Sequence, residues 1–299
     1  MAKPEKHDLV TERASAKINL NLHVTGRRRD GFHMLESLVA FAGIADVLTF
    51  SHAGQFTLSL SGPFAKDLEG VGANLVLEAA QALSDGFSDL LPGADINLQK
   101  NLPLASGIGG GSTDAAATLR GLLNLNKTQI SPAAVVQVAA SLGADVPVCL
   151  LSQAAFISGT GTLVEPMKAA LPELYVALVN PGIQVSTSDI FNALGMKPGS
   201  AEHITEPIAG PKPFLDAQEM VSYLKETRND LEPIAAQMVR EIDDVLEILF
   251  AQSACLLARM SGSGATCFGL FETQDDAASA AQNIKSANPN WWTAHGQLM

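Results

Sequence analysis

The feature that most constrains this chain of 299 residues is a glycine-rich segment, Pro-Leu-Ala-Ser-Gly-Ile-Gly-Gly-Gly-Ser-Thr, at residues 103–113. This glycine loop follows a strand-like alternation over 94–99 and precedes an Ala- and Leu-rich helical run over 115–123. Four glycines in positions 107–111 allow close approach of a ligand to the backbone, and consecutive free N–H groups form an anion-binding concavity. The following helix adds its positive N-terminal dipole, so the pattern predicts a phosphate site. A glycine turn without a ligand is the alternative.

The glycine loop differs from two common nucleotide-binding motifs. A Walker A loop ends in Gly-Lys-Ser or Gly-Lys-Thr, and this loop does not. Its glycine spacing also does not match the dinucleotide fingerprint. At its end, Ser112 and Thr113 could cap the following helix or reach a phosphate. The loop therefore indicates phosphate binding without identifying the nucleotide.

Three further segments carry residues that could perform chemistry. Lys17 adjoins an alternating strand, where a lysine that extends its ammonium to solvent is the alternative to a catalytic role. Asp145 follows a predicted helix end among small and apolar residues, which would desolvate a carboxylate and suit it to act as a base. A solvated Asp in a helix-terminating turn is the alternative. Residues 260–265, Met-Ser-Gly-Ser-Gly-Ala, form either a simple glycine hairpin or a segment that closes over phosphates.

Phe32 and His33 follow a loop that contains three consecutive arginines at 27–29. An aromatic ring beside a histidine can stack on a nucleobase and hydrogen-bond to it, whereas a packed Phe and a satisfied His are the commoner alternative. The arginine run is either a solvated loop or a means of steering an anionic substrate. The pair therefore indicates base binding only in combination with the other motifs.

Composition and charge limit the partners of the chain. Acidic residues outnumber basic ones 31 to 19, and a net charge of −12 repels a phosphate backbone, so we expect no nucleic-acid binding. Cys149, Cys255 and Cys267 form no Cys-x-x-Cys pair, which argues against a zinc knuckle or a disulfide framework. The N-terminus lacks the apolar run of a secretory signal, and no segment reaches about 18 apolar residues. We therefore expect a soluble cytoplasmic protein that does not bind membranes.

The remaining patterns indicate a mixed fold. Three strand signals in the first 61 residues, without a long helix between them, predict an antiparallel start. Residues 196–213 have the composition of a loop, and the paired tryptophans at 291–292 are expected to pack against the second domain. Strands are expected at 18–24, 35–50, 55–61, 94–99, 154–158, 174–179, 254–261 and 266–271, and helices at 74–83, 115–123, 132–142, 216–225, 232–250 and 275–286.

Taken in order, three motifs resemble those of the GHMP kinase superfamily: Ser-Ala-Lys-Ile-Asn-Leu at 15–20, the glycine loop, and Met-Ser-Gly-Ser-Gly-Ala at 260–265. Two further segments, Gly-Arg-Arg-Arg-Asp-Gly-Phe-His at 26–33 and Gly-Ala-Asp-Val-Pro at 143–147, narrow the resemblance. They are similar to the family of 4-diphosphocytidyl-2-C-methyl-D-erythritol kinases. The resemblance covers nearly the whole chain, from about residue 13 to about residue 272.

The resemblance implies an α+β fold of two GHMP kinase domains with the active site in the interdomain cleft. We expect an N-terminal domain over 1–158, with the ATP phosphate loop and the catalytic residues, and a C-terminal domain over 159–299. The implied activity is ATP-dependent, Mg²⁺-assisted phosphorylation of the 2-hydroxyl of 4-diphosphocytidyl-2-C-methyl-D-erythritol, a step of the non-mevalonate isoprenoid precursor pathway. A GHMP kinase for homoserine, mevalonate or a sugar, and an inactive nucleotide-binding module, are the alternatives.

The resemblance also implies roles for individual residues. Asp145 would be the catalytic base and Lys17 its partner, and Ser112 would lie near the magnesium ion. The expected ATP-binding residues are Pro103, Leu104, Ala105, Ser106, Gly107, Ile108, Gly109, Gly110, Gly111, Ser112 and Thr113. The expected substrate-binding residues are Asn19, Phe32, His33, Thr187 and Phe191.

The chain departs from the family pattern at two places. The family commonly has tyrosine at the position of Phe32, so the stacking face is retained while the phenol hydrogen bond is lost. Family members often have glycine where Ala105 and Ser106 stand. Because both residues are small, we expect the loop to keep its shape.

Overall fold

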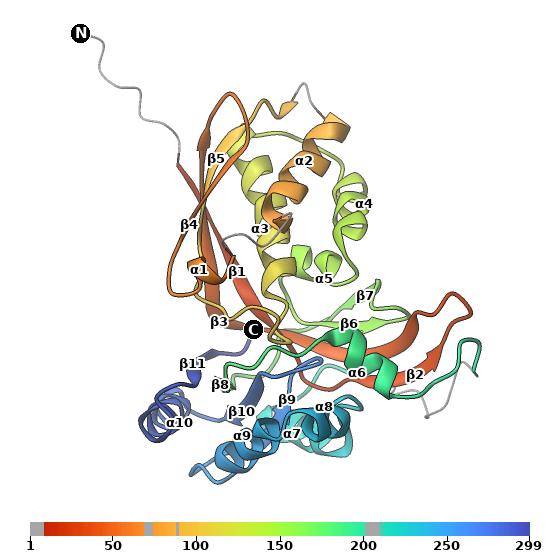
Figure 1. The fold of residues 1–299 in the computed structure, drawn as a ribbon, viewed down its shortest axis with the longest axis vertical. Coiled ribbons are helices and arrows are strands. Elements are labelled where there is room, and N and C mark those ends of the chain that lie inside the picture. The colour runs from red at the N-terminus through yellow and green to blue at the C-terminus, as the bar shows by residue number, and fades with distance from the viewer. Residues whose placement is uncertain (1–8, 69–73, 88–89, 201–209, 211) are drawn as a thin grey trace. The chain divides into compact units, whose positions relative to one another are not determined.

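Figure 1 shows the computed structural model, which describes residues 9–68, 74–87, 90–200, 210 and 212–299. The described chain divides into two compact units, each assembled from separate stretches of sequence. The first unit takes its residues from 1–15, 45–104 and 110–151, and the second takes its residues from 16–44, 105–109 and 152–299. The expected division at 158/159 remains a prediction about sequence domains. The compact units do not follow it, because the chain passes between them several times.

The first unit packs helices against a small sheet. Strand β5 (Ala94–Gln99) pairs antiparallel with the second half of β3 (His33–His52) and parallel with β4 (Thr57–Ser61). Alternate residues of β5 are buried, as the sequence alternation predicted. The helices of this unit are α1 (Ala65–Leu68), α2 (Leu75–Phe87), α3 (Gly110–Asn126), α4 (Pro132–Leu142) and α5 (Val146–Leu151).

Local sequence signals explain where α4 begins and ends. The hydroxyl of Ser131 accepts a hydrogen bond from the N–H of Ala134 at 3.3 Å, and Pro132 occupies the first turn, where no N–H is required. Gly143 follows the last turn. The observed bounds, 132–142, match the predicted helix.

The second unit contains a four-stranded antiparallel sheet in the order β11-β8-β10-β9. Strands β2 and β6 pair antiparallel with the first half of β3, which confirms the predicted antiparallel start. The strands of this unit are the end of β1 (Val10–Asn19), β2 (His23–Arg27), the start of β3, β6 (Ala155–Ser158), β7 (Leu163–Pro166), β8 (Tyr175–Asn180), β9 (Leu257–Met260), β10 (Cys267–Phe271) and β11 (Trp292–Gln297). Its helices are α6 (Thr187–Ala193), α7 (Ala217–Glu226), α8 (Glu232–Met238), α9 (Glu241–Phe250) and α10 (Gln274–Ala287).

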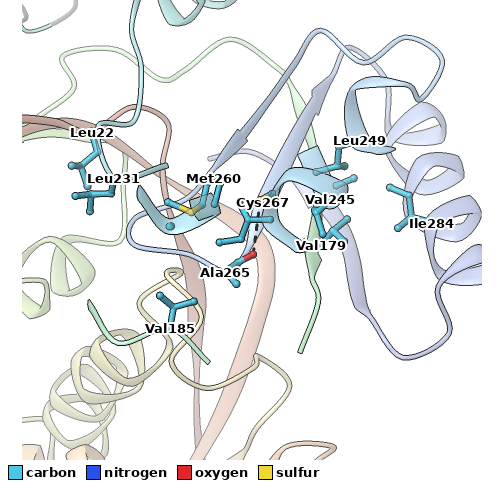
Figure 2. Packing of buried hydrophobic residues seen from close by; sticks show 14 of the residues in the cluster. Leu22, Val179, Val185, Leu231, Val245, Leu249, Met260, Ala265, Cys267 and Ile284 are labelled. Atoms are coloured by element: carbon cyan, nitrogen blue, oxygen red, sulfur yellow. Dashed lines mark hydrogen bonds between the residues drawn. The ribbon is translucent and has the colours of Figure 1, made fainter. Parts of the chain in front are cut away.

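A hydrophobic core joins the four-stranded sheet to its helices, as Figure 2 shows. Val179 on β8 and Cys267 on β10 lie in it together with Val245 and Leu249 on α9 and Ile284 on α10. The core also includes residues from outside the sheet, among them Leu22 and Leu231, so it fixes segments that are far apart in sequence.

Several sequence predictions need correction. The predicted helix 232–250 is two helices, because Val239 adopts an extended conformation and α9 begins afresh with three acidic residues in its first turn. The helix predicted from 115 begins at Gly110, and the predicted strand 18–24 is interrupted between Asn19 and His23.

Other elements were not predicted from the sequence. They are β7, β11, α1, α5 and α6. Most of the predicted loop 196–213 lies outside the described residues. Strand β11 pairs with β8, and Trp291 packs against the hydrophobic core of the second unit, which agrees with the predicted packing of that tail. None of the described helices is long and apolar enough to cross a membrane.

Candidate functional site

Lys17 on β1 lies directly against the glycine loop. Its backbone N–H donates to the carbonyl of Ile108 at 3.0 Å, and its side chain is buried. A Cβ atom added at Gly109 would lie 3.2 Å from both Cβ and Cε of Lys17, and Gly109 itself has a φ of +65°. Position 109 therefore requires glycine for its conformation and for the close approach of the lysine.

The third motif packs against the same loop. Ser261 donates its hydroxyl hydrogen to the carbonyl of Gly107 at 3.0 Å and accepts the backbone N–H of Asn19 at 3.1 Å. A Cβ atom at Gly107 would lie 2.3 Å from the carbonyl oxygen of Ser261. The second unit thus brings all three motifs together around Gly107, although they are distant in sequence. Hydrogen bonds between them explain the hairpin at 260–265 as a support for the glycine loop.

The start of the glycine loop departs from ordinary backbone geometry at a residue other than glycine. Ala105 is exposed and has a φ of +46°, in the left-handed region that favours glycine. Next to it, Ser106 is buried and accepts the N–H of Thr266 through its carbonyl at 3.1 Å. The loop conformation therefore explains why glycine suits position 105.

The end of the glycine loop forms the first turn of α3, in the first unit. Thr113 is buried, and its hydroxyl donates to the carbonyl of Gly110 at 2.9 Å. This hydroxyl is therefore bonded to the first turn of its own helix. Ser112 is half-buried, and Gly111 is exposed. The first N–H groups of a helix have no partner within it, so this turn can bind an anion.

Beneath this turn lies a charged cluster that sequence reasoning did not identify. Lys100 donates from Nζ to Asp46 at 2.5 Å and to Asp114 at 2.6 Å, and all three side chains are buried. Asp46 also accepts the N–H of Asn101 at 2.5 Å and that of Leu102 at 2.8 Å. A Cβ atom at Gly110 would lie 3.2 Å from Nζ of Lys100. We call Lys100, Asp46 and Asp114 the charged triad.

The electrostatics of the charged triad differ between its members. Burial alone would lower the pKa of Lys100, but the two neighbouring carboxylates raise it above its ordinary value. Burial raises the pKa of Asp114 to about 8; Lys100 opposes this shift and Asp46 adds to it. One oxygen of Asp114 is buried without a hydrogen-bond partner. Asp114 therefore keeps its proton to a higher pH than an ordinary aspartic acid does.

Asp145 lies in the first unit, after the end of α4 and immediately before the start of α5. Its side chain is half-buried, and its carbonyl accepts the N–H of Cys149 at 3.1 Å. The signal for α5 was present in the sequence, since Pro147 near a helix start is favourable. The two members of the expected catalytic pair thus belong to different units, Asp145 to the first and Lys17 to the second.

Two of the expected substrate-binding residues meet in the second unit. The rings of His33 and Phe191 have centroids 4.9 Å apart and planes inclined by 32°. Burial, followed in size by the charge of Arg27, lowers the pKa of His33, and its Nε2 is buried without a hydrogen-bond partner. A neutral imidazole with an unused ring nitrogen is suited to a polar ligand group. Phe32 is 64% exposed and available for stacking.

The two other expected substrate-binding residues contact the motifs. Thr187 and Ser263 share a hydrogen bond between their hydroxyls at 2.8 Å. Asn19 donates from Nδ2 to the hydroxyl of Ser37 at 2.8 Å. Both residues are therefore connected to the third motif, Thr187 through Ser263 and Asn19 through Ser261.

The described residues include no cluster of three or more His, Cys, Asp or Glu side chains that could hold a metal ion.

Comparisons with known proteins agree with the motifs. Residues 74–153 match the GHMP kinases N terminal domain, and residues 215–290 match the GHMP kinases C terminal domain. The chain is 46% identical over 295 residues to a protein of Methylorubrum extorquens (strain PA1) named 4-diphosphocytidyl-2-C-methyl-D-erythritol kinase, covering 97% of this chain and 99% of the relative. A protein of the same name from Bradyrhizobium sp. (strain ORS 278) is 44% identical over 291 residues, covering 96% of each chain.

A solved structure gives the same result for the fold. The crystal structure of a 4-(cytidine 5'-diphospho)-2C-methyl-D-erythritol kinase is similar to this chain with a TM-score of 0.73 and 30% identity. The similarity covers 97% of this chain and 99% of that one.

Proposed function

Because the chain belongs to the GHMP kinases, and within them to the family of 4-diphosphocytidyl-2-C-methyl-D-erythritol kinases, we propose that it phosphorylates the 2-hydroxyl of 4-diphosphocytidyl-2-C-methyl-D-erythritol with ATP. The supporting observation in the structure is the meeting of the three motifs around Gly107. This reaction belongs to the non-mevalonate isoprenoid precursor pathway, and we propose that it takes place in the cytoplasm.

The glycine loop would hold the phosphates of ATP. Gly107 and Gly109 have positive φ values and no side chains, which lets the carbonyl of Ser261 and the side chain of Lys17 pack closely against the loop and shape it. The first turn of α3 offers N–H groups and the positive end of the helix dipole. Both features favour an anion. Both belong to the backbone, so they do not depend on a particular side chain.

Asp145 would act as the catalytic base. It would accept the proton of the substrate 2-hydroxyl while that oxygen forms a bond to the γ-phosphorus. The bond between the γ-phosphorus and the bridging oxygen breaks, and ADP leaves with the electron pair. Lys17 would favour the ionised carboxylate and balance the negative charge that develops on the attacking oxygen. The position of Lys17 against Gly109 supports this role, because it puts the lysine beside the proposed phosphate site.

Magnesium would neutralise charge on the phosphates and be held mainly by ATP oxygens. The chain offers the hydroxyl of Ser112, a hard oxygen ligand that is half-buried in the first turn of α3. A hydroxyl beside a phosphate-binding turn fits magnesium better than a soft metal.

His33 and Phe191 would bind the cytosine of the substrate, together with Phe32. The neutral imidazole of His33 has an unused buried nitrogen for the base edge, and Phe32 is exposed for stacking on its face. Homoserine, mevalonate and sugars have no base, so this group of residues would have no partner in those substrates. We expect His33→Ala to raise KM for the cytidine substrate while KM for ATP stays near its original value.

The proposal is tested by measuring ADP release with a panel of alcohols at fixed ATP and magnesium. We expect turnover with 4-diphosphocytidyl-2-C-methyl-D-erythritol and little with homoserine, mevalonate or simple sugars. A preference for one of those alcohols would contradict the substrate assignment. ATP binding without turnover of any alcohol would favour an inactive nucleotide-binding module instead.

A further inference from the structure

The segment Arg-Asn-Asp-Leu-Glu at residues 228–232, which follows α7 and ends at the first residue of α8, has no part in the function described so far. It lies in the second unit and makes hydrogen bonds to both the third motif and the chain around β2. We propose that Asn229, Asp230 and Glu232 are positioning residues. They would fix both the residues on the phosphate side of the active site and those on its substrate side. We call these three residues the polar bracket. The proposal rests on the proposed function and adds residues to it that the motifs do not include.

Asn229 holds the third motif through two hydrogen bonds. Its Nδ2 donates to the carbonyl of Met260 at 2.9 Å and to that of Gly262 at 2.8 Å, and its Oδ1 accepts the N–H of Leu231 at 3.0 Å. The side chain is buried, and these three bonds occupy both amide hydrogens and the oxygen. The carbonyls it binds flank Ser261, so Asn229 fixes the residue whose hydroxyl contacts the glycine loop.

Glu232 adds a third hydrogen bond to the same segment. Its Oε2 accepts the N–H of Met260 at 2.7 Å, so Met260 is held at both its N–H and its carbonyl. From there the contacts continue to the glycine loop, because Ser261 donates to the carbonyl of Gly107. A Cβ atom at Gly262 would lie 2.8 Å from that carbonyl, which shows how closely the two backbones approach. A small shift of the third motif would therefore displace the loop.

Asp230 holds the opposite side. Its Oδ2 accepts the N–H of Val24 at 2.7 Å, and its backbone N–H donates to the carbonyl of Leu22 at 2.8 Å. The N–H of Leu22 in turn donates to the carbonyl of Arg228 at 2.9 Å. Val24 lies on β2, which pairs with the start of β3 so that Arg27 is opposite His33. Asp230 thereby fixes the strand that supports the proposed base-binding histidine.

Packing keeps the polar bracket in place. Leu231 is fully buried in the hydrophobic core, which also contains Leu22 and Met260 (Figure 2). Arg259, the residue before Met260, donates to the carbonyls of Leu20 and Thr227 at 2.8 and 2.7 Å. The bracket thus packs against buried apolar side chains and is flanked by the hydrogen bonds of Arg259, which limit changes in its geometry.

The two sides of the bracket predict different kinetic effects. Asn229 acts through the third motif on the glycine loop, so its loss should affect ATP most strongly. Asp230 acts through β2 on His33, so its loss should affect the cytidine substrate. A residue that only stabilised the fold would instead lower the amount of active protein and leave both KM values unchanged.

The first test is Asn229→Asp, which keeps the size of the side chain and its acceptor for Leu231 but removes both donations. We expect the Kd for ATP, measured without acceptor, to rise about tenfold or more, because displacing a binding group by a fraction of an ångström has large effects. Glu232→Gln is the matched control, since it keeps an oxygen that can accept the N–H of Met260, and we expect a change below about threefold. An unchanged Kd for ATP in Asn229→Asp would overturn the proposal.

The second test is Asp230→Ala. We expect KM for 4-diphosphocytidyl-2-C-methyl-D-erythritol to rise about tenfold while KM for ATP stays within about twofold. Asp230→Asn keeps one oxygen for the N–H of Val24 and should restore most of the affinity. Equal increases in both KM values for Asp230→Ala, or no increase, would overturn the assignment of Asp230 to the substrate side.

Ile284→Val controls for stability, because Ile284 lies in the same core on α10, outside the three motifs and the polar bracket (Figure 2). We expect it to lower Tm and to leave both KM values and the Kd for ATP unchanged. Failure of the proposed function has a different signature, because the unaltered protein would then fail to turn over the cytidine substrate. The Kd for ATP of Asn229→Asp would still test the positioning role in that case.

Discussion

Residues 105–109 of the glycine loop, in the second unit, are held by neutral hydrogen bonds from Lys17, Ser261 and Thr266. The next residues, from Gly110, begin a helix in the first unit that lies against the charged triad. One half of the same loop is therefore fixed by backbone and hydroxyl groups, which do not titrate near neutral pH. The other half depends on buried charges, whose energy is sensitive to pH and to the loss of any partner. The comparison teaches that the two halves should respond to different perturbations.

The largest expected effect is on the charged half. Lys100→Met removes the only cation of the triad and leaves Asp46 and Asp114 buried without their partner. We expect the free energy of unfolding to fall by about 3 kcal/mol or more, the usual cost of breaking a buried ion pair. Urea unfolding at pH 7 measures this, with Lys66→Met on the exposed side of α1 as the control. A loss below about 1 kcal/mol would mean that the triad contributes little to stability.

The neutral half is tested by Gly107→Ala. An alanine there needs a φ near +76° and puts its Cβ atom 2.3 Å from the carbonyl of Ser261. We expect a loss of about 2 kcal/mol or more, with weaker ATP binding, because both the strain and the overlap are unfavourable. Gly31→Ala separates the two causes, since Gly31 has a φ of +94° but no atom within 4 Å of its added Cβ. If both variants lose the same stability, the contact with Ser261 has no effect of its own.

A pH titration distinguishes the halves directly. The pKa of Asp114 is raised to about 8 by burial, so the folded state keeps a proton that the unfolded state loses near the ordinary value of 3.8. Stability from this group is complete below that ordinary value and falls as pH rises toward about 8, by up to about 1.4 kcal/mol per pH unit. Asp114→Asn should flatten the profile, which urea unfolding at pH 5, 6, 7 and 8 would measure. Parallel profiles would contradict the raised pKa.

The smallest expected effect is a gain in stability. Ala105→Gly removes the strain of an alanine with a φ of +46°, while glycine loses more entropy on folding. We expect a net gain of up to about 1 kcal/mol. Ala254→Gly is the control, because Ala254 has a φ of +63° and lies in a turn outside the motifs. A similar gain in stability in both variants, with a change in the Kd for ATP only for Ala105→Gly, would confirm that backbone strain at 105 lies in the loop that binds ATP. A loss of stability in Ala105→Gly would contradict the predicted strain.

Local signals allowed part of the fold to be predicted from the sequence. The helix at 132–142 has a capping serine, a proline in its first turn and a glycine at its end, so its bounds follow from neighbouring residues. The break at Val239 could not be predicted in the same way, because the amphipathic pattern continues through it and the extended residue is decided by packing.

In the candidate site, too, local sequence signals indicated some residues, whereas others depend on contacts between distant segments. The motifs that bear Lys17, Gly107 and Ser261 could be read from the sequence, but their contacts with one another depend on the folded chain. Lys100 and Asn229 could not be identified, because each acts on residues that are distant in sequence or unremarkable in type. The signals available for the charged triad were Lys100, shortly before the glycine loop, and Asp114, directly after it.

The catalytic role of Asp145 is the central claim, and Asp145→Asn tests it most directly. We expect kcat to fall by about a thousandfold with the cytidine substrate, because general-base catalysis is lost. The Kd for ATP should stay within about twofold, since the amide has nearly the same size and the glycine loop is untouched. Turnover near that of the unaltered protein would contradict the account, because phosphoryl transfer would then proceed without the proposed base.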